Sequence, residues 1–207
     1  MAVSYKLLSK TYGLLDIIYF KNNSPRLILM NKIPNGEYKI LEIEIGTAEN
    51  SIILAKNKPK LKILGIDLSD EMLEIANNRV IENNIKNIEL IKMDGTNIKF
   101  DKNAFDFIII SLLLHELTEG VANKILKECK NVLKQNGKIY VLEWENPKKI
   151  IQKIIFSVIK LLEPKEYKHF MKKDLNKYFY KNGFQIKNIE YGDYSKVIEL
   201  GKSETST

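Results

Sequence analysis

The chain has 207 residues, of which 44% are hydrophobic and 29% charged, so it can bury one sizeable core and is interpreted as one domain. Lysine and arginine outnumber aspartate and glutamate by 33 to 26, but the excess lysines are scattered, which favours a solvated basic surface over an RNA-binding or membrane-binding block. A single cysteine, Cys129, excludes an internal disulfide framework and a cysteine-clustered metal site. The sequence shows neither a signal-peptide pattern nor an apolar run of about 20 residues, which predicts a cytoplasmic protein.

The N-terminal segment predicts two helices. Residues 5–20 place apolar side chains at helical spacing on one face. Pro25 suits the first turn of a second, short helix ending near Lys32, because the N–H that proline lacks would be unpaired there. The sequence Ile-Pro-Asn-Gly at 33–36 predicts a turn that leads into the first strand.

The most informative stretch is 39–56, where an alternating β-branched run breaks at Gly46 and reopens as a helix. Because Gly46 has no Cβ, backbone can pass close to a ligand there, and the first N–H groups of the following helix face that space. The dinucleotide fingerprint G-x-G-x-x-G needs glycines where this chain has Glu44 and Ala48, and a carboxylate at Glu44 would repel a diphosphate. The stretch therefore predicts a ligand site above Gly46 that does not bind a dinucleotide.

A second buried strand, 62–67, ends at Asp67, about twenty positions after the glycine turn. A carboxylate at the tip of the second strand of a βαβ unit can accept hydrogen bonds from both ribose hydroxyls, so the spacing predicts Asp67 as a ribose ligand. Ser69 then caps a helix whose first turn holds Asp70 and Glu71, where negative charge complements the helix dipole. We interpret these two acids as structural.

Residues 88–92 predict a third strand, and Asp94 follows it on the edge of the sheet where open α/β folds bind ligands. Asp94 either contacts the ligand or forms a plain Asp-Gly turn with Gly95. Residues 105–114 have a continuous apolar centre, which predicts a strand covered on both faces and adjacent to the first. His115 comes directly after this strand, where it is either a base or a capping or packing histidine.

Three helices, a strand, a hairpin and a tail complete the chain. The helix expected at 148–162 has a wide apolar face and a narrow lysine stripe; it packs on the fold, caps an apolar substrate or rests on a membrane surface. Residues 201–207 should be a disordered polar tail. The other predicted elements are a helix at 119–133 ended by Asn136 and Gly137, a strand at 138–143, a helix at 173–182 ended by Gly183, and an antiparallel hairpin at 186–191 and 196–200.

In this order, the motifs resemble those of the class I S-adenosylmethionine-dependent methyltransferases. Within that superfamily the chain looks most like the ubiquinone/menaquinone-biosynthesis type of small-molecule methyltransferase, through residues 9–16, 67–73 and 142–147. The resemblance implies an α/β fold: a Rossmann-like three-layer sandwich with a mostly parallel seven-stranded sheet and a C-terminal antiparallel hairpin. The segments that carry the resemblance are Ile40-Leu-Glu42, Asp67 with Ser-Asp-Glu-Met-Leu73, Met93-Asp-Gly95, Phe105-Asp-Phe-Ile-Ile109, Leu113-Leu-His-Glu-Leu117 and Val132 to Glu143.

The resemblance implies S-adenosyl-L-methionine as the cofactor, with Asp94 near the adenine amino group. Methyl transfer is an in-line displacement at a carbon activated by the sulfonium, so it needs positioning and, where the acceptor must lose a proton, a base. His115 is the candidate catalytic base, and no metal ligand is expected. The cofactor-binding residues implied are Glu42, Glu44, Gly46, Thr47, Asp67, Leu68, Asp94, Gly95 and Ser111.

We expect a single methyltransferase domain over 1–200, with an N-terminal helical lid at 1–35, a cofactor-binding core at 36–146, and a helical cap with a closing hairpin at 147–200. Core packing would explain the N-terminal helices equally well. The expected partner is a small, apolar or aromatic methyl acceptor. We expect a monomer or homodimer without a stable nucleic-acid partner, and with peripheral membrane contact only through 148–162.

Two alternatives stay open. The net charge of +7 would suit an RNA or protein methyltransferase, and Glu44 with Ala48 would suit a non-catalytic binding module. Glu44 departs most from the family pattern. It either attracts the cationic cofactor, or it obstructs the methionine pocket, and without ligand Glu42 and Glu44 should raise one another's pKa.

Overall fold

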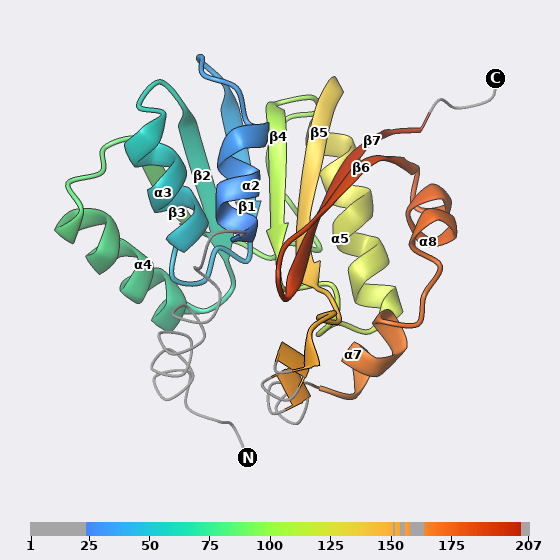
Figure 1. The fold of residues 1–207 in the computed structure, drawn as a ribbon. Helices are drawn as coiled ribbons and strands as arrows, with labels where there is room; N and C mark the ends of the chain where they lie inside the picture. Colours follow the sequence, from blue (N-terminus) through green and yellow to red (C-terminus); the bar gives the residue numbers. More distant parts are fainter. Residues whose placement is uncertain (1–23, 151, 154–155, 158–163, 204–207) are drawn as a thin grey trace.

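The computed structural model describes residues 24–150, 152–153, 156–157 and 164–203. Its centre is a seven-stranded sheet of order β3-β2-β1-β4-β5-β7-β6 (Figure 1). The first five strands pair in parallel, and β7 pairs antiparallel with both β5 and β6. This confirms the predicted fold class and the position of β4 beside β1. The strands are β1 (Lys39–Ile43), β2 (Lys62–Asp67), β3 (Ile88–Lys92), β4 (Phe105–Ser111), β5 (Leu133–Trp144), β6 (Phe184–Tyr191) and β7 (Ser195–Lys202).

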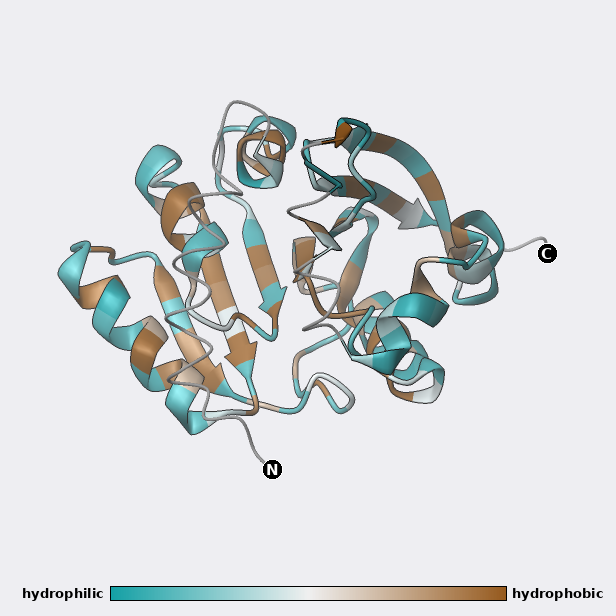
Figure 2. Ribbon diagram, turned by 60° about the horizontal axis from the view of Figure 1, so that its bottom comes forward, coloured by the Kyte–Doolittle hydropathy of each residue, from teal (hydrophilic) through white to brown (hydrophobic). Residues whose placement is uncertain are grey.

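Helices cover both faces of the sheet because the side chains of its strands alternate between two apolar clusters. In β1, Ile40 packs with α2 and α3, whereas Leu41 and Ile43 pack with α5. Figure 2 shows the middle of the central strands in brown and the helices banded in brown and teal, as a three-layer fold requires. One face carries α2 (Pro25–Lys32), α3 (Glu49–Asn57) and α4 (Asp70–Glu82), and the other carries α5 (Glu119–Val132), α7 (Lys165–Phe170) and α8 (Leu175–Lys181).

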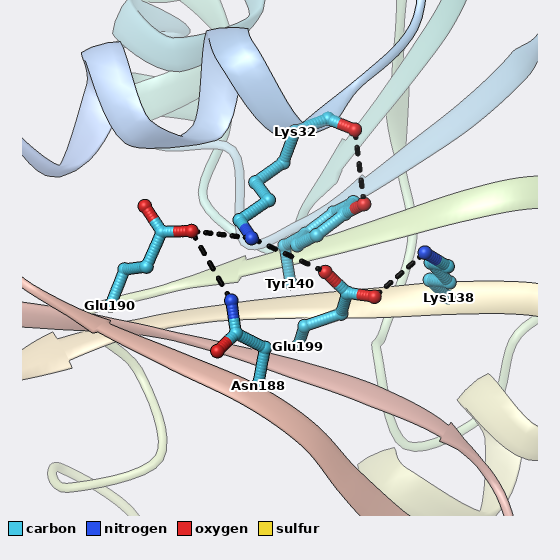
Figure 3. Close-up of polar contacts among 6 residues, drawn as sticks. All are labelled: Lys32, Lys138, Tyr140, Asn188, Glu190 and Glu199. Carbon is cyan, nitrogen blue, oxygen red and sulfur yellow. Dashed lines mark hydrogen bonds and ion pairs between the residues drawn. The ribbon is translucent and has the colours of Figure 1, made fainter.

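Helix α2 is fastened to the far edge of the sheet by a polar network (Figure 3). Lys32, at its last position, forms ion pairs with Glu190 of β6 and with Glu199 of β7, the latter at 3.8 Å. The Tyr140 hydroxyl donates a hydrogen bond to the backbone carbonyl of Lys32 at 3.3 Å. Lys138 pairs with Glu199 at 2.7 Å on its other side. These contacts hold α2 on the sheet, so this part of the expected lid is a sheet-covering helix.

Several element boundaries differ from the prediction. β5 begins at Leu133 rather than at Lys138, and the register with β4 shifts within this added part. Gly137 lies in it with no space for a side chain, because a Cβ there would stand 2.8 Å from the Asp106 carbonyl oxygen. β7 runs to Lys202, so the first two residues of the expected tail pair in the sheet.

Other predictions fall partly outside the described ranges. The helix expected at 5–20 lies outside them, as do residues 204–207 of the expected tail. Of the helix expected at 148–162, residues 150, 152–153 and 156–157 are described and helical. Helix α7 was not predicted as a separate element. Within the described ranges, no helix combines the length and apolarity needed to cross a membrane.

Candidate functional site

A cavity of about 460 Å³ opens at the carboxyl ends of β1, β2 and β4, a volume typical of small-molecule sites. In the sheet, β1 lies between β2 on one side and β4 on the other. The cavity therefore lies where the strand order reverses, which is the usual ligand position in such sheets. Seven sequence-predicted residues line it: Glu42, Glu44, Gly46, Thr47, Asp67, Leu68 and Ser111. Lining residues that the sequence analysis missed include Arg26, Asn50, Met72, Leu112 and Glu116.

The turn after β1 has an unusual backbone. Glu44, Gly46 and Ala48 all have left-handed conformations, with φ of 50°, 56° and 60°, although only glycine adopts them freely. The turn is held against β2, because the Ile45 N–H donates to the Ile66 carbonyl at 2.9 Å. Gly65 in β2 makes this packing possible, since a Cβ there would stand 2.0 Å from Cδ1 of Ile45.

Asp67 lies at the tip of β2 as predicted, and its side chain is buried. One carboxylate oxygen accepts the Gly46 N–H at 2.9 Å, and the other accepts the Ser69 N–H at 2.9 Å. Each carboxylate oxygen has a second lone pair, so both oxygens can accept a ribose hydroxyl when Glu44 donates no hydrogen bond to Asp67. The ribose assignment itself stays a prediction.

Glu44 is partly buried beside Asp67. Burial, followed by the negative charge of Asp67 and that of Asp94, raises the pKa of Glu44 to about 7, while the Leu68 N–H stabilises its ionised form. Its side chain also hydrogen-bonds to the Asp67 carboxylate. Protonation of Glu44 relieves the repulsion between the two carboxyl groups, so near neutral pH Glu44 interconverts between its neutral and its ionised form.

Glu42 lines the cavity but is engaged by α3. One carboxylate oxygen accepts a hydrogen bond from the Asn50 amide at 2.8 Å, and the other accepts one from the Ser51 hydroxyl. Asn50 in turn accepts a hydrogen bond from the Arg26 guanidinium at 3.1 Å. Burial raises the pKa of Glu42 against the lowering effect of these donors. Glu42 therefore joins α2 and α3 beneath the cavity, and its direct contact with a cofactor stays a prediction.

Asp94 and Gly95 lie near the cavity without lining it. Asp94 is exposed, and its carboxylate accepts the Thr96 N–H at 2.8 Å, which holds its pKa below the ordinary value. This is the geometry of an Asp-Gly turn. Gly95 is buried against Ile43 and close to the Glu44 carboxylate, because a Cβ there would stand 3.1 Å from one and 3.7 Å from the other. The adenine assignment of Asp94 stays a prediction.

His115 follows β4 as expected, but its imidazole is only 1% exposed and is not part of the cavity lining. Its Nδ1 lies 2.5 Å from the carboxylate of Glu143, a residue of β5 that is fully buried. The other Glu143 oxygen accepts the Leu114 N–H at 3.0 Å. A carboxylate at Nδ1 holds the proton on that nitrogen, so Nε2 is the basic nitrogen of the ring. The ring of Tyr167 packs edge-on against the imidazole.

Glu143 was not predicted as a functional residue, although the sequence around it carries a signal. A charged residue inside an otherwise apolar strand is rarely buried without a partner. In Val141-Leu-Glu-Trp144 this carboxylate is the only charged group among three apolar side chains. His115, on the loop after the neighbouring strand, is the residue that supplies this partner.

Comparison with known proteins agrees with this geometry. A family model described as a methyltransferase domain matches residues 40–137. The demethylmenaquinone methyltransferase of Thermotoga maritima is 32% identical over 128 residues, which cover 61% of this chain and 53% of that protein. The protein of the same name from Staphylococcus carnosus is 30% identical over 148 residues, which cover 69% of this chain and 59% of that protein. The chain thus spans little more than half the length of these curated relatives.

The fold has a close counterpart among solved structures. The crystal structure of a SAM-dependent methyltransferase from Aquifex aeolicus matches with a TM-score of 0.74 and 22% sequence identity. The match covers 93% of this chain and 96% of that one. At this identity the likeness concerns the fold alone.

We predict that Gly65→Ala lowers the free energy of unfolding by about 1–3 kcal/mol, because the added methyl group overlaps Ile45. Urea denaturation measures the loss. Ile45→Val removes the overlapping terminal methyl, so the same glycine substitution should cost less in that background. Gly120→Ala is the matched control, since a Cβ at Gly120 in α5 meets no heavy atom within 4 Å and a helix favours alanine. Equal costs of Gly65→Ala in both backgrounds would contradict the proposed overlap.

We predict that Glu44→Gln stabilises the protein in a pH-dependent way. Glu44 keeps its proton up to about pH 7 when folded and up to about its ordinary pKa of 4.5 when unfolded. The folded state therefore binds more protons between these values, and this residue's contribution to stability falls as pH rises through that window. Because water screens the partly exposed side chain, the gain from Glu44→Gln at about pH 8 should be about 1–2 kcal/mol. Urea denaturation at about pH 8 and about pH 4 tests this, and an equal gain at both pH values would contradict it.

Proposed function

Because residues 40–137 belong to the methyltransferase-domain family and the chain carries the class I fold, we propose that the protein transfers a methyl group from S-adenosylmethionine to a small-molecule acceptor. The observation that carries this proposal is the cavity above Gly46, with Asp67 at the tip of β2. When bound there, S-adenosylmethionine supplies an activated methyl carbon. The chain supplies orientation and exclusion of water.

The proposed orientation uses the residues of the cavity rim. Asp67 accepts the ribose hydroxyls, and Leu68, which is 56% exposed, offers an apolar surface beside it. The first turn of α3 borders the same cavity through Glu49 and Asn50, so its N–H groups are available to an anionic group of the ligand. Arg26 is the one cation among the described residues that line the cavity, and it suits the carboxylate of the methionine moiety.

The proposed acceptor is apolar and aromatic. The matched relatives are named demethylmenaquinone methyltransferases, and we extend that class of acceptor to this chain. An aromatic cluster of Trp144, Phe156, Tyr167 and Tyr194 supports this, because it packs at the carboxyl end of β5. Leu112 joins this cluster to the cavity, since it packs on the cluster and also lines the cavity.

His115 and Glu143 are proposed as a base and its positioning partner. Glu143 fixes the ring and its tautomer, and His115 accepts a proton from an acceptor hydroxyl as the methyl group is transferred. Tyr167 packs on the ring of His115 and belongs to the aromatic cluster, so we place the acceptor on this side of the imidazole.

Calorimetric titration with S-adenosylmethionine and S-adenosylhomocysteine tests the cofactor proposal directly. Transfer of a labelled methyl group to a panel of hydroquinones, phenols, RNA and protein then tests the acceptor class. We expect micromolar-range binding and labelling of aromatic hydroxylated acceptors. Labelling of RNA or protein alone would assign the chain to another acceptor class.

We predict that Asp67→Ala weakens binding of S-adenosylmethionine by about 1.5–3 kcal/mol, the value of hydrogen bonds to a charged acceptor. Titration calorimetry measures the loss, and thermal unfolding shows whether the fold persists. Asp67→Asn is the matched control, because its amide keeps one oxygen acceptor and should lose less. Unchanged affinity in folded Asp67→Ala would remove the ribose assignment.

We predict that His115→Ala lowers the rate of methyl transfer by at least about a hundredfold, the usual contribution of a positioned base. Cofactor affinity should change by no more than a few fold, because His115 does not line the cavity. Glu143→Gln keeps the size of its side chain but loses the charge, so it should lower the rate less and shift its pH profile. If folded His115→Ala is fully active, the pair is structural.

A further inference from the structure

Glu44 is presented to the cavity by a backbone conformation that disfavours a side chain. Its φ of 50° places it among the left-handed residues of the turn, and its carboxyl group lies against Asp67 and Gly95. Both features oppose a carboxylate at this position, the first by backbone strain and the second by charge repulsion. A residue that the fold disfavours at a ligand site calls for a functional reason.

Acidic groups dominate the surroundings of Glu44 on nearly every element. Glu42 on β1 is held by α3, Glu49 on α3 is paired with Arg79 of α4, and Glu116 lies on the loop after β4. Arg26 comes from α2 and is hydrogen-bonded to Asn50. The charged residues that line the cavity are Arg26, Glu42, Glu44, Glu49, Asp67 and Glu116; Asp94 stands beside it, with Lys124 near Asp94.

The methyl donor and its product differ in charge. S-adenosylmethionine carries a sulfonium, whereas S-adenosylhomocysteine has a neutral thioether in its place, and both keep the ammonium and carboxylate groups. An ionised carboxylate near the sulfur therefore favours the donor by Coulomb attraction, and a protonated one does not. Glu44 and Asp67 together can offer either one or two negative charges.

We propose that Glu44 is a specificity-determining residue, which makes the site prefer the cationic donor over the neutral-sulfur product, with release of a proton from the Glu44–Asp67 pair to solvent when the donor binds. This inference rests on the proposed function. It gives the strained carboxylate a role that glycine could not fill. It also implies that the product competes weakly with the donor above neutral pH.

The expected pH dependence follows from the charge of the pair. In acid, the donor must displace the proton of Glu44, so its affinity falls; above neutral pH Glu44 is already ionised. With the pKa of Glu44 at about 7, the fraction of molecules in which Glu44 is ionised rises from about a tenth at pH 6 to about nine tenths at pH 8. The donor's affinity should therefore rise by up to about tenfold over that range, and the product's should change much less.

The test is calorimetric titration of the full chain with donor and product at about pH 6 and about pH 8. At pH 6, titration in two buffers of different ionisation enthalpy measures the proton released. Parent protein should release a proton with the donor and much less with the product. Glu44→Gln should abolish the release and reduce the donor-to-product preference. Glu74→Gln is the matched control, because Glu74 is exposed on α4 and lies outside the cavity lining.

Several outcomes would overturn the inference. An equal pH dependence for donor and product in parent protein, or a dependence that persists in Glu44→Gln, would assign the effect to another group. Tighter binding of both ligands to Glu44→Gly would show that Glu44 obstructs the pocket, and would leave the proposed function intact. Absence of binding by either ligand at both pH values and in every variant would overturn the inference together with the proposed function.

Discussion

The attachment of the turn after β1 to the tip of β2 is the constraint on which the candidate site depends. Ile45 forms a backbone hydrogen bond to Ile66 and packs its side chain over Gly65, while the Gly46 N–H donates to Asp67. These contacts hold a backbone with three left-handed residues in a conformation that local preference opposes. They also place the Asp67 carboxylate beside the Gly46 N–H, so one set of contacts both builds the turn and orients the carboxylate that is proposed to bind the ribose.

The acidic character of the cavity is a second consequence of this arrangement. Both carboxylate oxygens of Glu42 accept hydrogen bonds, one from Asn50 and the other from Ser51. Glu44 accepts the Leu68 N–H, but it also lies against the negatively charged Asp67 and hydrogen-bonds to it. The fold therefore stores electrostatic repulsion at the site, and a cationic ligand would relieve it. Such storage is common where stability is reduced for function.

Helix α2 shows how a distant contact can shape the site. Lys32, at its C-terminal end, is fastened to Glu190 and Glu199 on the last two strands (Figure 3). Arg26, near its N-terminal end, reaches the cavity and hydrogen-bonds to Asn50. The C-terminal hairpin thus holds the helix that carries Arg26, a cavity residue from the opposite end of the chain. The hairpin therefore both completes the sheet and helps to position a residue of the cavity.

The sequence by itself determined most strands and helices, because hydrophobic periodicity and the glycine turn are local signals. The resemblance of its motifs to a known family added the sheet class and most of the residues that line the cavity. Asp67 was identified from spacing alone, since parallel strands of similar length end at the same edge. Only the tertiary structure decided how the acids divide their roles. Glu42 accepts hydrogen bonds from Asn50 and Ser51, and Asp94 accepts one from the Thr96 N–H. Glu44 instead lies against the carboxylate of Asp67. The tertiary structure also decided that His115 is buried against Glu143 and that Arg26 reaches the cavity and Asn50. Each contact joins segments far apart in the sequence, so no local pattern identifies the partner.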